Sequence, residues 1–89
     1  MKKKIRALFD GSTCVGIIEI INTNRPNKTA YVSWSIFKAE GKPIGGLINN
    51  YFLGNEDFSD EEVFDLVKDQ IQKYRIGRKR VFSNVEFEP

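Results

Sequence analysis

The side chains that could support chemistry in this 89-residue chain are carboxylates. The sequence has no histidine, which is the usual general base and a common metal ligand, so Cys14 has no imidazole to activate it. Asp10 stands in the segment LFDGS, and Glu61 and Glu62 lie near the start of an expected helix. Carboxylates in such positions can hold divalent ions such as Mg²⁺, which would allow metal-assisted hydrolysis.

The segment LFDGS, with Gly16 early in the next expected strand, resembles the opening of a ribonuclease H-like domain. In that family an aspartate on the first strand holds metal, a helix after a run of antiparallel strands carries a metal-binding glutamate, and a later strand brings another aspartate. The resemblance implies that Asp10 and one of the two glutamates bind metal. The sequence has Asn84 and Glu86 where the later aspartate is expected.

The same carboxylates also have local explanations. Asp-Gly-Ser is a favourable turn sequence. Glu61 and Glu62 belong to the first turn of the expected helix, where negative charge is stabilising. We therefore predict a protein that is not an enzyme, with no catalytic, metal-binding or cofactor-binding residues, and keep a ribonuclease H-like nuclease centred on Asp10 as an alternative.

A second group of side chains could form a binding surface. Aromatic and small polar residues alternate with apolar ones in the expected strands and fall on the side opposite the core. Aromatic anchors with a polar rim are typical of surfaces that bind proteins, and an exposed edge strand could also pair with a partner. We predict a small protein-binding module, acting as an inhibitor, adaptor or subunit, with a homodimer as a further arrangement. The predicted partner-binding residues are Tyr31, Ser33, Ser35, Phe37 and Phe82.

Clusters of basic residues favour nucleic acid as an alternative partner. The net charge is only +2, so composition alone does not require a polyanion. Aromatic side chains on an open sheet face could nevertheless stack on unpaired bases while Lys and Arg contact phosphates. The residues predicted for this alternative are Lys3, Lys4, Arg6, Lys73, Arg75, Arg78, Lys79 and Arg80.

The element with the clearest signals is a helix that begins after Ser59 and ends at Gly77. Ser59 and Glu62 have the S-x-x-E spacing of a capping box, and Phe58 and Val63 could form a hydrophobic staple. Gly77 is expected to supply the left-handed residue at the C-terminal end. An apolar stripe along this helix requires a sheet face to cover.

Alternation of apolar and polar residues predicts four strands before this helix and one after it. The second strand is rich in β-branched residues and apolar on both faces, so it should lie in the middle of a sheet. The fourth is interrupted by Gly45-Gly46, which indicates a bulge or a close backbone approach. The predicted strands span residues 3–9, 14–21, 29–39, 43–53 and 80–88.

The predicted fold is α+β, an antiparallel sheet of four to five strands with one helix packed on one face, in the order ββββαβ, and residues 1–89 form a single domain. A lone cysteine cannot form an internal disulfide and no segment is apolar enough to span a membrane, so we expect a cytoplasmic protein without membrane contact. The abundance of Lys, Asn and Ile suits a bacterial or phage protein. The predicted core is Ile5, Ala7, Phe9, Ile17, Val32, Trp34, Ile36, Val63, Val67, Ile71, Tyr74, Val81 and Val85.

Overall fold

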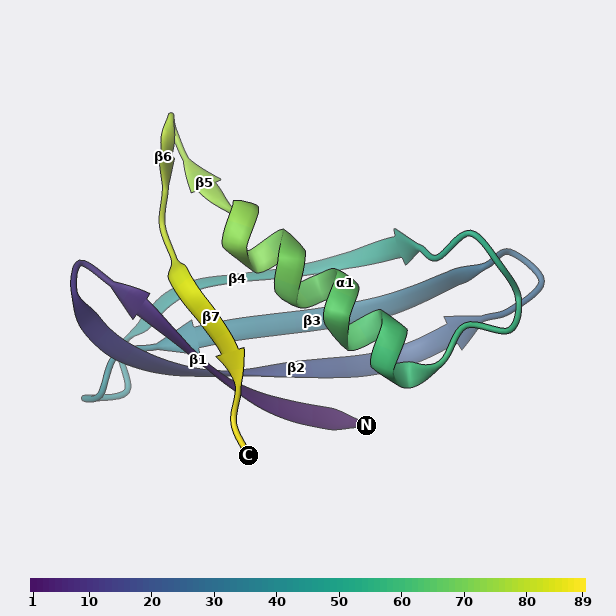
Figure 1. Cartoon of the computed structure of the whole chain (residues 1–89), viewed down its shortest axis with the longest axis horizontal. Coiled ribbons are helices and arrows are strands. Elements are labelled where there is room, and N and C mark those ends of the chain that lie inside the picture. Colours follow the sequence, from purple (N-terminus) through teal and green to yellow (C-terminus); the bar gives the residue numbers. More distant parts are fainter.

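The computed structural model describes all 89 residues and contains one five-stranded sheet, one helix and one short hairpin (Figure 1). The predicted α+β class and the order ββββαβ of the main elements are confirmed. The elements are β1 (Lys2–Phe9), β2 (Ser12–Asn24), β3 (Thr29–Phe37), β4 (Pro43–Phe52), α1 (Asp60–Lys73), β5 (Arg75–Ile76), β6 (Lys79–Arg80) and β7 (Ser83–Phe87).

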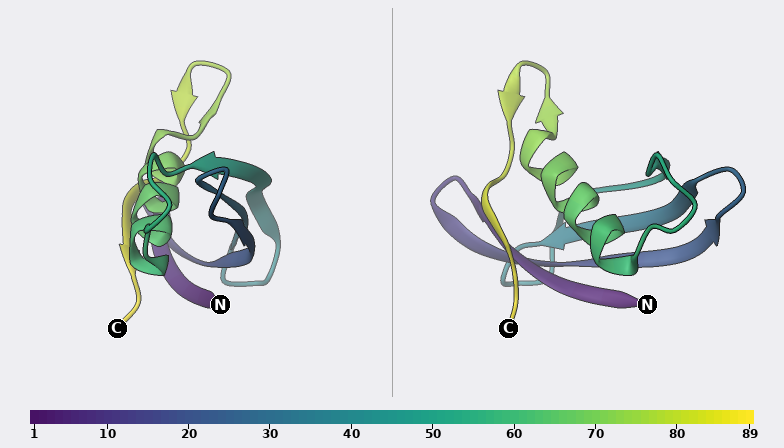
Figure 2. Two further views of the ribbon diagram at one scale, coloured as in Figure 1. Left: turned by 90° about the vertical axis from the view of Figure 1, so that its right-hand side faces the viewer. Right: turned by 45° about the vertical axis from the view of Figure 1, so that its right-hand side comes forward.

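The main sheet has the strand order β4-β3-β2-β1-β7, and every neighbouring pair is antiparallel. The second strand therefore lies in the middle, as its composition predicts, while β4 and β7 form the two edges. Figure 2 shows α1 against one face of this twisted sheet, with no element on the other face. We refer to that second face as the uncovered face.

The core lies between α1 and the sheet. Most of the predicted core is buried, with Phe9, Tyr74 and Val81 partly buried against it. The prediction is wrong for Ile17, which lies half-buried on the uncovered face. The neighbouring Ile18 faces the helix, and adjacent residues of a strand point to opposite sides. The core also contains side chains outside that prediction, namely Cys14, Ile18, Ile20, Ala30, Tyr51, Phe58, Phe64 and Phe82.

The start of α1 is confirmed, but its predicted end is wrong. The Ser59 hydroxyl accepts a hydrogen bond from the Glu62 amide at 3.1 Å, and Phe58 is buried beside this cap. The helix ends at Lys73 because Tyr74 adopts an extended conformation and packs its ring edge-on against a core tryptophan. Gly77, with φ 64°, instead makes the turn between β5 and β6.

At Gly45 and Gly46, β4 has both a bulge and a close backbone approach, the two alternatives that the sequence indicates. The register with β3 shifts next to Gly45, which places a bulge there. A side chain at Gly45 would meet the Phe82 ring at 3.3 Å, and one at Gly46 would meet the Trp34 carbonyl oxygen at 2.9 Å. Gly45 therefore lets β4 lie close to the Phe82 ring, and Gly46 lets it lie close to the backbone of β3.

The predicted alternation in the last strand is wrong at its start. Phe82 is expected on the outward side, yet it is only 2% exposed and belongs to the core. Asn84 has φ 50°, and the pairing of β7 with β1 is irregular at this point. This break in the extended backbone allows Phe82 and Val85, three residues apart, both to face inward.

Candidate functional site

The four predicted partner-binding residues of β3 do lie on the uncovered face. The intervening residues are buried under the helix, so Tyr31, Ser33, Ser35 and Phe37 share the opposite side. Phe82, the fifth predicted member, is excluded because it is a core residue. On the uncovered face β3 therefore contributes one exposed aromatic ring, Tyr31, beside half-buried neighbours.

The free side of β4 continues this face at the edge of the sheet. Leu53 donates its amide to the Lys28 carbonyl at 2.8 Å, in the same register that pairs Phe52 with Thr29. Hydrogen bonding alternates along an antiparallel pair, so residues 47, 49 and 51 bond to β3. The amides and carbonyls of residues 46, 48, 50 and 52 consequently point away from the sheet. We call residues 46–52 the free edge.

The free edge contains no charged side chain. Its sequence is GLINNYF, and Leu47, Ile48 and Phe52 are 43%, 58% and 67% exposed. Side chains alternate between the two faces, so Ile48 and Phe52 extend the uncovered face while Leu47 lies on the helix side. The free edge thus combines exposed apolar side chains with backbone groups that no strand pairs. One of these groups, the Asn50 amide, donates to the Asn49 Oδ1 at 2.9 Å.

The basic residues near the start of the chain are close to carboxylates. Lys3 forms an ion pair of 2.8 Å with Glu61 and lies over the rings of two phenylalanines, so it belongs to the packing of helix on sheet. Arg6 lies opposite Glu86 in the register of β1 and β7. Lys2 is 3.9 Å from a glutamate of β2, and the Glu88 amide bonds to the Lys4 carbonyl. Lys2 and Lys3 therefore have acidic partners, while Arg6 and Lys4 lie beside acidic residues in the register of the strands without forming ion pairs.

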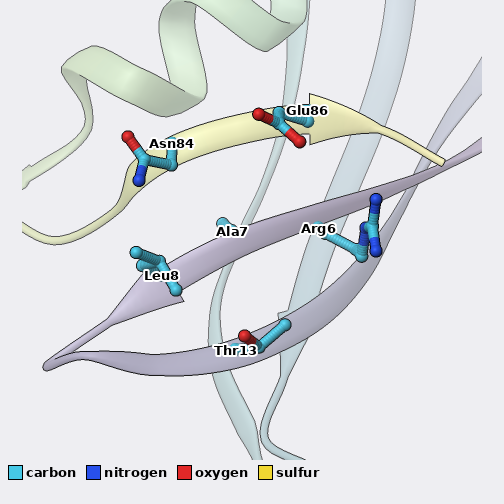
Figure 3. A pocket seen from close by; sticks show the side chains of 6 residues that line it. All are labelled: Arg6, Ala7, Leu8, Thr13, Asn84 and Glu86. Carbon is cyan, nitrogen blue, oxygen red and sulfur yellow. The ribbon is translucent and has the colours of Figure 1, made fainter.

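A hollow of about 250 Å³ lies between β1 and β7 and includes Arg6 in its lining (Figure 3). Figure 3 shows Asn84 and Glu86 on β7 and Arg6 and Leu8 on β1, with Thr13 of β2 at the border. Its charged side chains, Arg6 and Glu86, form no ion pair. The hollow brings together one acid and one base and offers no second carboxylate.

The second basic cluster stands apart from the first. Residues 75–80 form a hairpin that projects beyond the end of α1 (Figure 1). Lys3 contacts the first turn of α1, whereas this hairpin follows its last turn, so the 14-residue helix separates the two clusters by about 21 Å. The two sets of residues predicted for nucleic acid therefore do not form one surface.

We call residues 75–80 the basic hairpin. Arg75 lies directly opposite Arg80 in its short ladder, and every residue in it is exposed. Lys73, just before it, forms an ion pair of 2.9 Å with Asp69, but no cation of the hairpin itself has an acidic partner. Its four cationic residues are Arg75, Arg78, Lys79 and Arg80.

An aromatic cluster fixes the root of the basic hairpin. Val81 donates its amide to the Tyr74 carbonyl at 3.1 Å, which closes the base of the hairpin. The rings of Tyr74 and Phe82, one on each side of that base, lie 6.1 Å apart and nearly parallel. Both rings also meet the Trp34 ring, at 5.1 Å and 6.1 Å. The hairpin is therefore mounted on core side chains.

The carboxylates implied by the nuclease resemblance are not brought together. Asp10 and Gly11, both with positive φ, make the turn between β1 and β2. Glu61 contacts Lys3 near the other end of β1, seven residues away, which is about 23 Å along a strand. Glu62 remains in the helix cap. No group of three or more His, Cys, Asp or Glu side chains is placed to hold a metal ion.

Two buried polar atoms in the core have no hydrogen-bond partner, the Trp34 Nε1 and the Tyr51 hydroxyl. Burial raises the pKa of Tyr51 above its ordinary value of 10.0, and the nearby Trp34 side chain partly offsets that effect. Neither atom lies at a surface hollow that a ligand could enter. These two buried atoms therefore affect the stability of the fold and its dependence on pH, and they are not part of a candidate binding site.

Comparison with known proteins assigns no family: the chain matches no protein-family model, no curated protein and no solved structure. The one helix is too short and too polar to cross a membrane. The free edge and the basic hairpin are the two surfaces that sequence reasoning located only in part. The lack of charge in residues 46–52 is a signal that could have identified the first of them.

Proposed function

We propose that this protein is a small binding module that recognises a partner protein by adding a strand of that partner to the free edge. The observation that carries the proposal is the run of seven uncharged residues, 46–52, along an unpaired side of the sheet. Backbone groups on such an edge can bond an extended segment, while alternate side chains provide specificity. The role would be that of an inhibitor, adaptor or subunit in the cytoplasm rather than that of an enzyme.

An unprotected edge of this kind is unusual in a protein that has to stay monomeric. Edge strands are normally protected from pairing by charged side chains, prolines or bulges. In β4 the proline and the bulge lie at the first end, at Pro43 and beside Gly45. The free edge beyond them has none of these features, so a binding role accounts for their absence there.

The side chains around the free edge indicate the chemistry of the partner segment. A strand paired with residues 46–52 would run beside Ile48 and Phe52 on the uncovered face and beside Leu47 on the other. Apolar or β-branched side chains in that strand would cover these residues. On the uncovered face, Tyr31 lies opposite Asn50 and could contact the rim of the same partner.

The decisive experiment removes one outward donor without changing the bonds to β3. Asn50→Pro deletes an amide that points away from the sheet and in the free protein bonds only to the exposed Asn49 side chain, which a partner strand would displace. Asn50→Ala keeps this amide, and proline is tolerated at edge positions of this type. With each variant as bait, we expect the same partner protein to bind Asn50→Ala and the unaltered chain but not Asn50→Pro. Equal recovery by both variants would reject strand addition at this edge.

Two further measurements keep this test interpretable. Ile48→Lys adds a charge to the free edge at an exposed position, where substitutions have little effect on stability, and should also abolish binding. In the complex, the amides of residues 48, 50 and 52 should exchange with solvent much more slowly than in the free protein. Treatment with nuclease should leave the complex intact, which separates a protein partner from one held by nucleic acid.

A further inference from the structure

We propose that the basic hairpin is a second, independent site that binds the phosphate backbone of double-stranded nucleic acid. This site shares no residue with the free edge, so either proposal can fail without the other. Four cationic residues within the six-residue hairpin form the site: Arg75, Arg78, Lys79 and Arg80.

The arrangement of these charges is unfavourable in the free protein. Arg75 and Arg80 face each other across the ladder of β5 and β6, and like charges directly opposite one another are destabilising. A bound anion would remove that repulsion. The folding of the hairpin does not explain why two arginines lie opposite each other, whereas binding of a polyanion would explain it.

No ion pair neutralises the hairpin, although Asp10 and Arg80 line the same surface hollow. The nearest acid along the helix, Asp69, is paired with Lys73. The negative end of the helix dipole favours cations, but its effect falls off within the last turn, and α1 ends at Lys73. Arg78 and Lys79, at the hairpin turn, therefore have no acid close to them in an ion pair.

The hairpin is also fixed in position. The stacked rings of Tyr74 and Phe82 pack against Trp34, and the bond from the Val81 amide to the Tyr74 carbonyl closes its base. A ligand would consequently meet charges that are already placed, which reduces the entropy lost on binding.

The chemistry of the hairpin fits a duplex better than other polyanions. Arginine makes bidentate contacts with phosphate, and the major groove of a duplex admits a two-stranded ribbon. Binding of single strands depends on stacking between bases and aromatic rings, but residues 75–80 contain no aromatic side chain and Phe82 is buried. Insertion into a lipid surface requires an apolar face, and Ile76 is the one apolar side chain of the hairpin.

The test measures binding to a labelled duplex of about two helical turns by fluorescence anisotropy over a range of salt concentrations. We expect micromolar affinity that falls steeply with salt, with a log–log slope of about −3 if three to four phosphates are contacted. Arg78→Gln with Lys79→Gln should weaken binding at least about tenfold and bring the slope closer to zero by about two units. Repeating the measurement with DNA and RNA duplexes identifies which source of phosphates is preferred.

The matched control removes the same charge elsewhere. Lys2→Gln with Lys4→Gln removes the same number of charges on the uncovered face, where Lys2 pairs with Glu19, and should change affinity less than about twofold. An equal loss in both double variants would overturn the proposal in favour of unspecific attraction. Equal affinity for a single strand, or binding to phosphatidylserine vesicles without binding to the duplex, would overturn the assignment to duplex nucleic acid.

The last comparison separates this site from the proposed protein site. Asn50→Pro should bind the duplex as tightly as the unaltered chain, because the free edge does not touch the hairpin cations. The hairpin double variant should retain any protein partner captured through the free edge. Loss of duplex binding in Asn50→Pro, with the fold intact, would show that the hairpin does not act on its own.

Discussion

The free edge and the basic hairpin offer opposite kinds of recognition on one small protein. The free edge has no charged side chain and presents its backbone, so a ligand must bring amides and carbonyls of its own. The basic hairpin presents cationic side chains, and its backbone is paired within itself. Exposed β structure can therefore bind a ligand through its backbone or through charged side chains, depending on which of these groups has no partner within the protein.

The two regions also differ in how they depend on the rest of the fold. The free edge is bonded to β3 along its whole length and belongs to the main sheet. The basic hairpin has only two register pairs and is held through Tyr74 and Phe82 at its base. Changes in the sheet should therefore affect both regions, whereas changes in the hairpin should leave the free edge unaltered.

The largest effect is expected from Trp34→Ala, because this side chain supports both regions. Trp34 lies opposite Leu47 of β4, and its ring meets the two rings at the root of the hairpin. Removing so large a buried side chain should cost about 3 to 5 kcal/mol of unfolding free energy. Urea denaturation would measure it, and a loss below about 1 kcal/mol would show that the regions do not share this support.

A second prediction distinguishes the inner and outer bonds of β4. Asn49→Pro deletes an amide that bonds to β3 and should destabilise the protein by about 3 kcal/mol, as prolines do inside bonded elements. Asn50→Pro deletes an outward amide and should cost less than about 1 kcal/mol. Thermal unfolding of the two variants side by side tests this. Equal destabilisation would show that the alternation along β4 is placed in the wrong phase.

Tyr51→Phe should stabilise the protein at neutral pH, by less than Trp34→Ala and Asn49→Pro destabilise it. The Tyr51 hydroxyl is buried without a hydrogen-bond partner, so removing it should raise the unfolding free energy by up to about 1 kcal/mol. The pKa of this group is raised in the folded state. The unfolded chain therefore loses the proton first, and stability is lost as pH rises through and beyond about 10.

Unfolding curves between neutral and alkaline pH would check this prediction. The unaltered chain should lose stability above pH 10 more steeply than Tyr51→Phe, because the variant lacks that ionisation. If the two curves run parallel, the Tyr51 hydroxyl does not ionise differently in the folded and unfolded states. The matched variant Tyr31→Phe, altered at an exposed position, should behave as the unaltered chain does.

The smallest effect on stability is expected from Arg80→Glu, which turns the repulsive pair with Arg75 into an attractive one. At low salt the unfolding free energy should rise by about 0.5 kcal/mol, and this gain should shrink as salt is added. Duplex affinity should fall in the same variant. A variant that gains stability while losing affinity would show that the arginine pair serves binding at a cost in stability. Unchanged stability would mean that the two arginines do not repel each other measurably.

The sequence predicts the fold well wherever local signals and burial agree. The Ser59 cap, the apolar stripe of α1 and the alternation of β3 each point to one structure, and the protein adopts it. The end of the helix and the start of β7 are wrong because a tertiary contact decides them. Packing of Tyr74 and Phe82 around Trp34 ends the helix at Lys73, before Gly77, and overrides the alternation expected from residue 80 onward. Gly77 keeps its left-handed conformation, but in the turn of the hairpin.

The candidate sites are less predictable because they depend on strand order. Alternation alone places Tyr31 and Phe37 on the outward side of β3, but no local pattern reveals that β4 lies at an edge. The position of Arg75 opposite Arg80 likewise follows from a turn at Gly77, which the sequence assigns to a helix end. Which strands are neighbours in the sheet, rather than which residue types they contain, distinguishes these sites from the rest of the surface.

The pairing of β7 with β1 has a consequence for how the chain acquires its structure. β1 begins at residue 2 and its partner β7 ends at residue 87, so this ladder closes a loop of nearly the whole chain. Long loops carry the largest closure entropy, and contacts between distant residues form slowly. During synthesis β1 to β4 can pair before β7, the second neighbour of β1, has been made. Until those final residues emerge, the nascent sheet has an open edge at each end, and this is the stage at which we expect it to be most prone to aggregation.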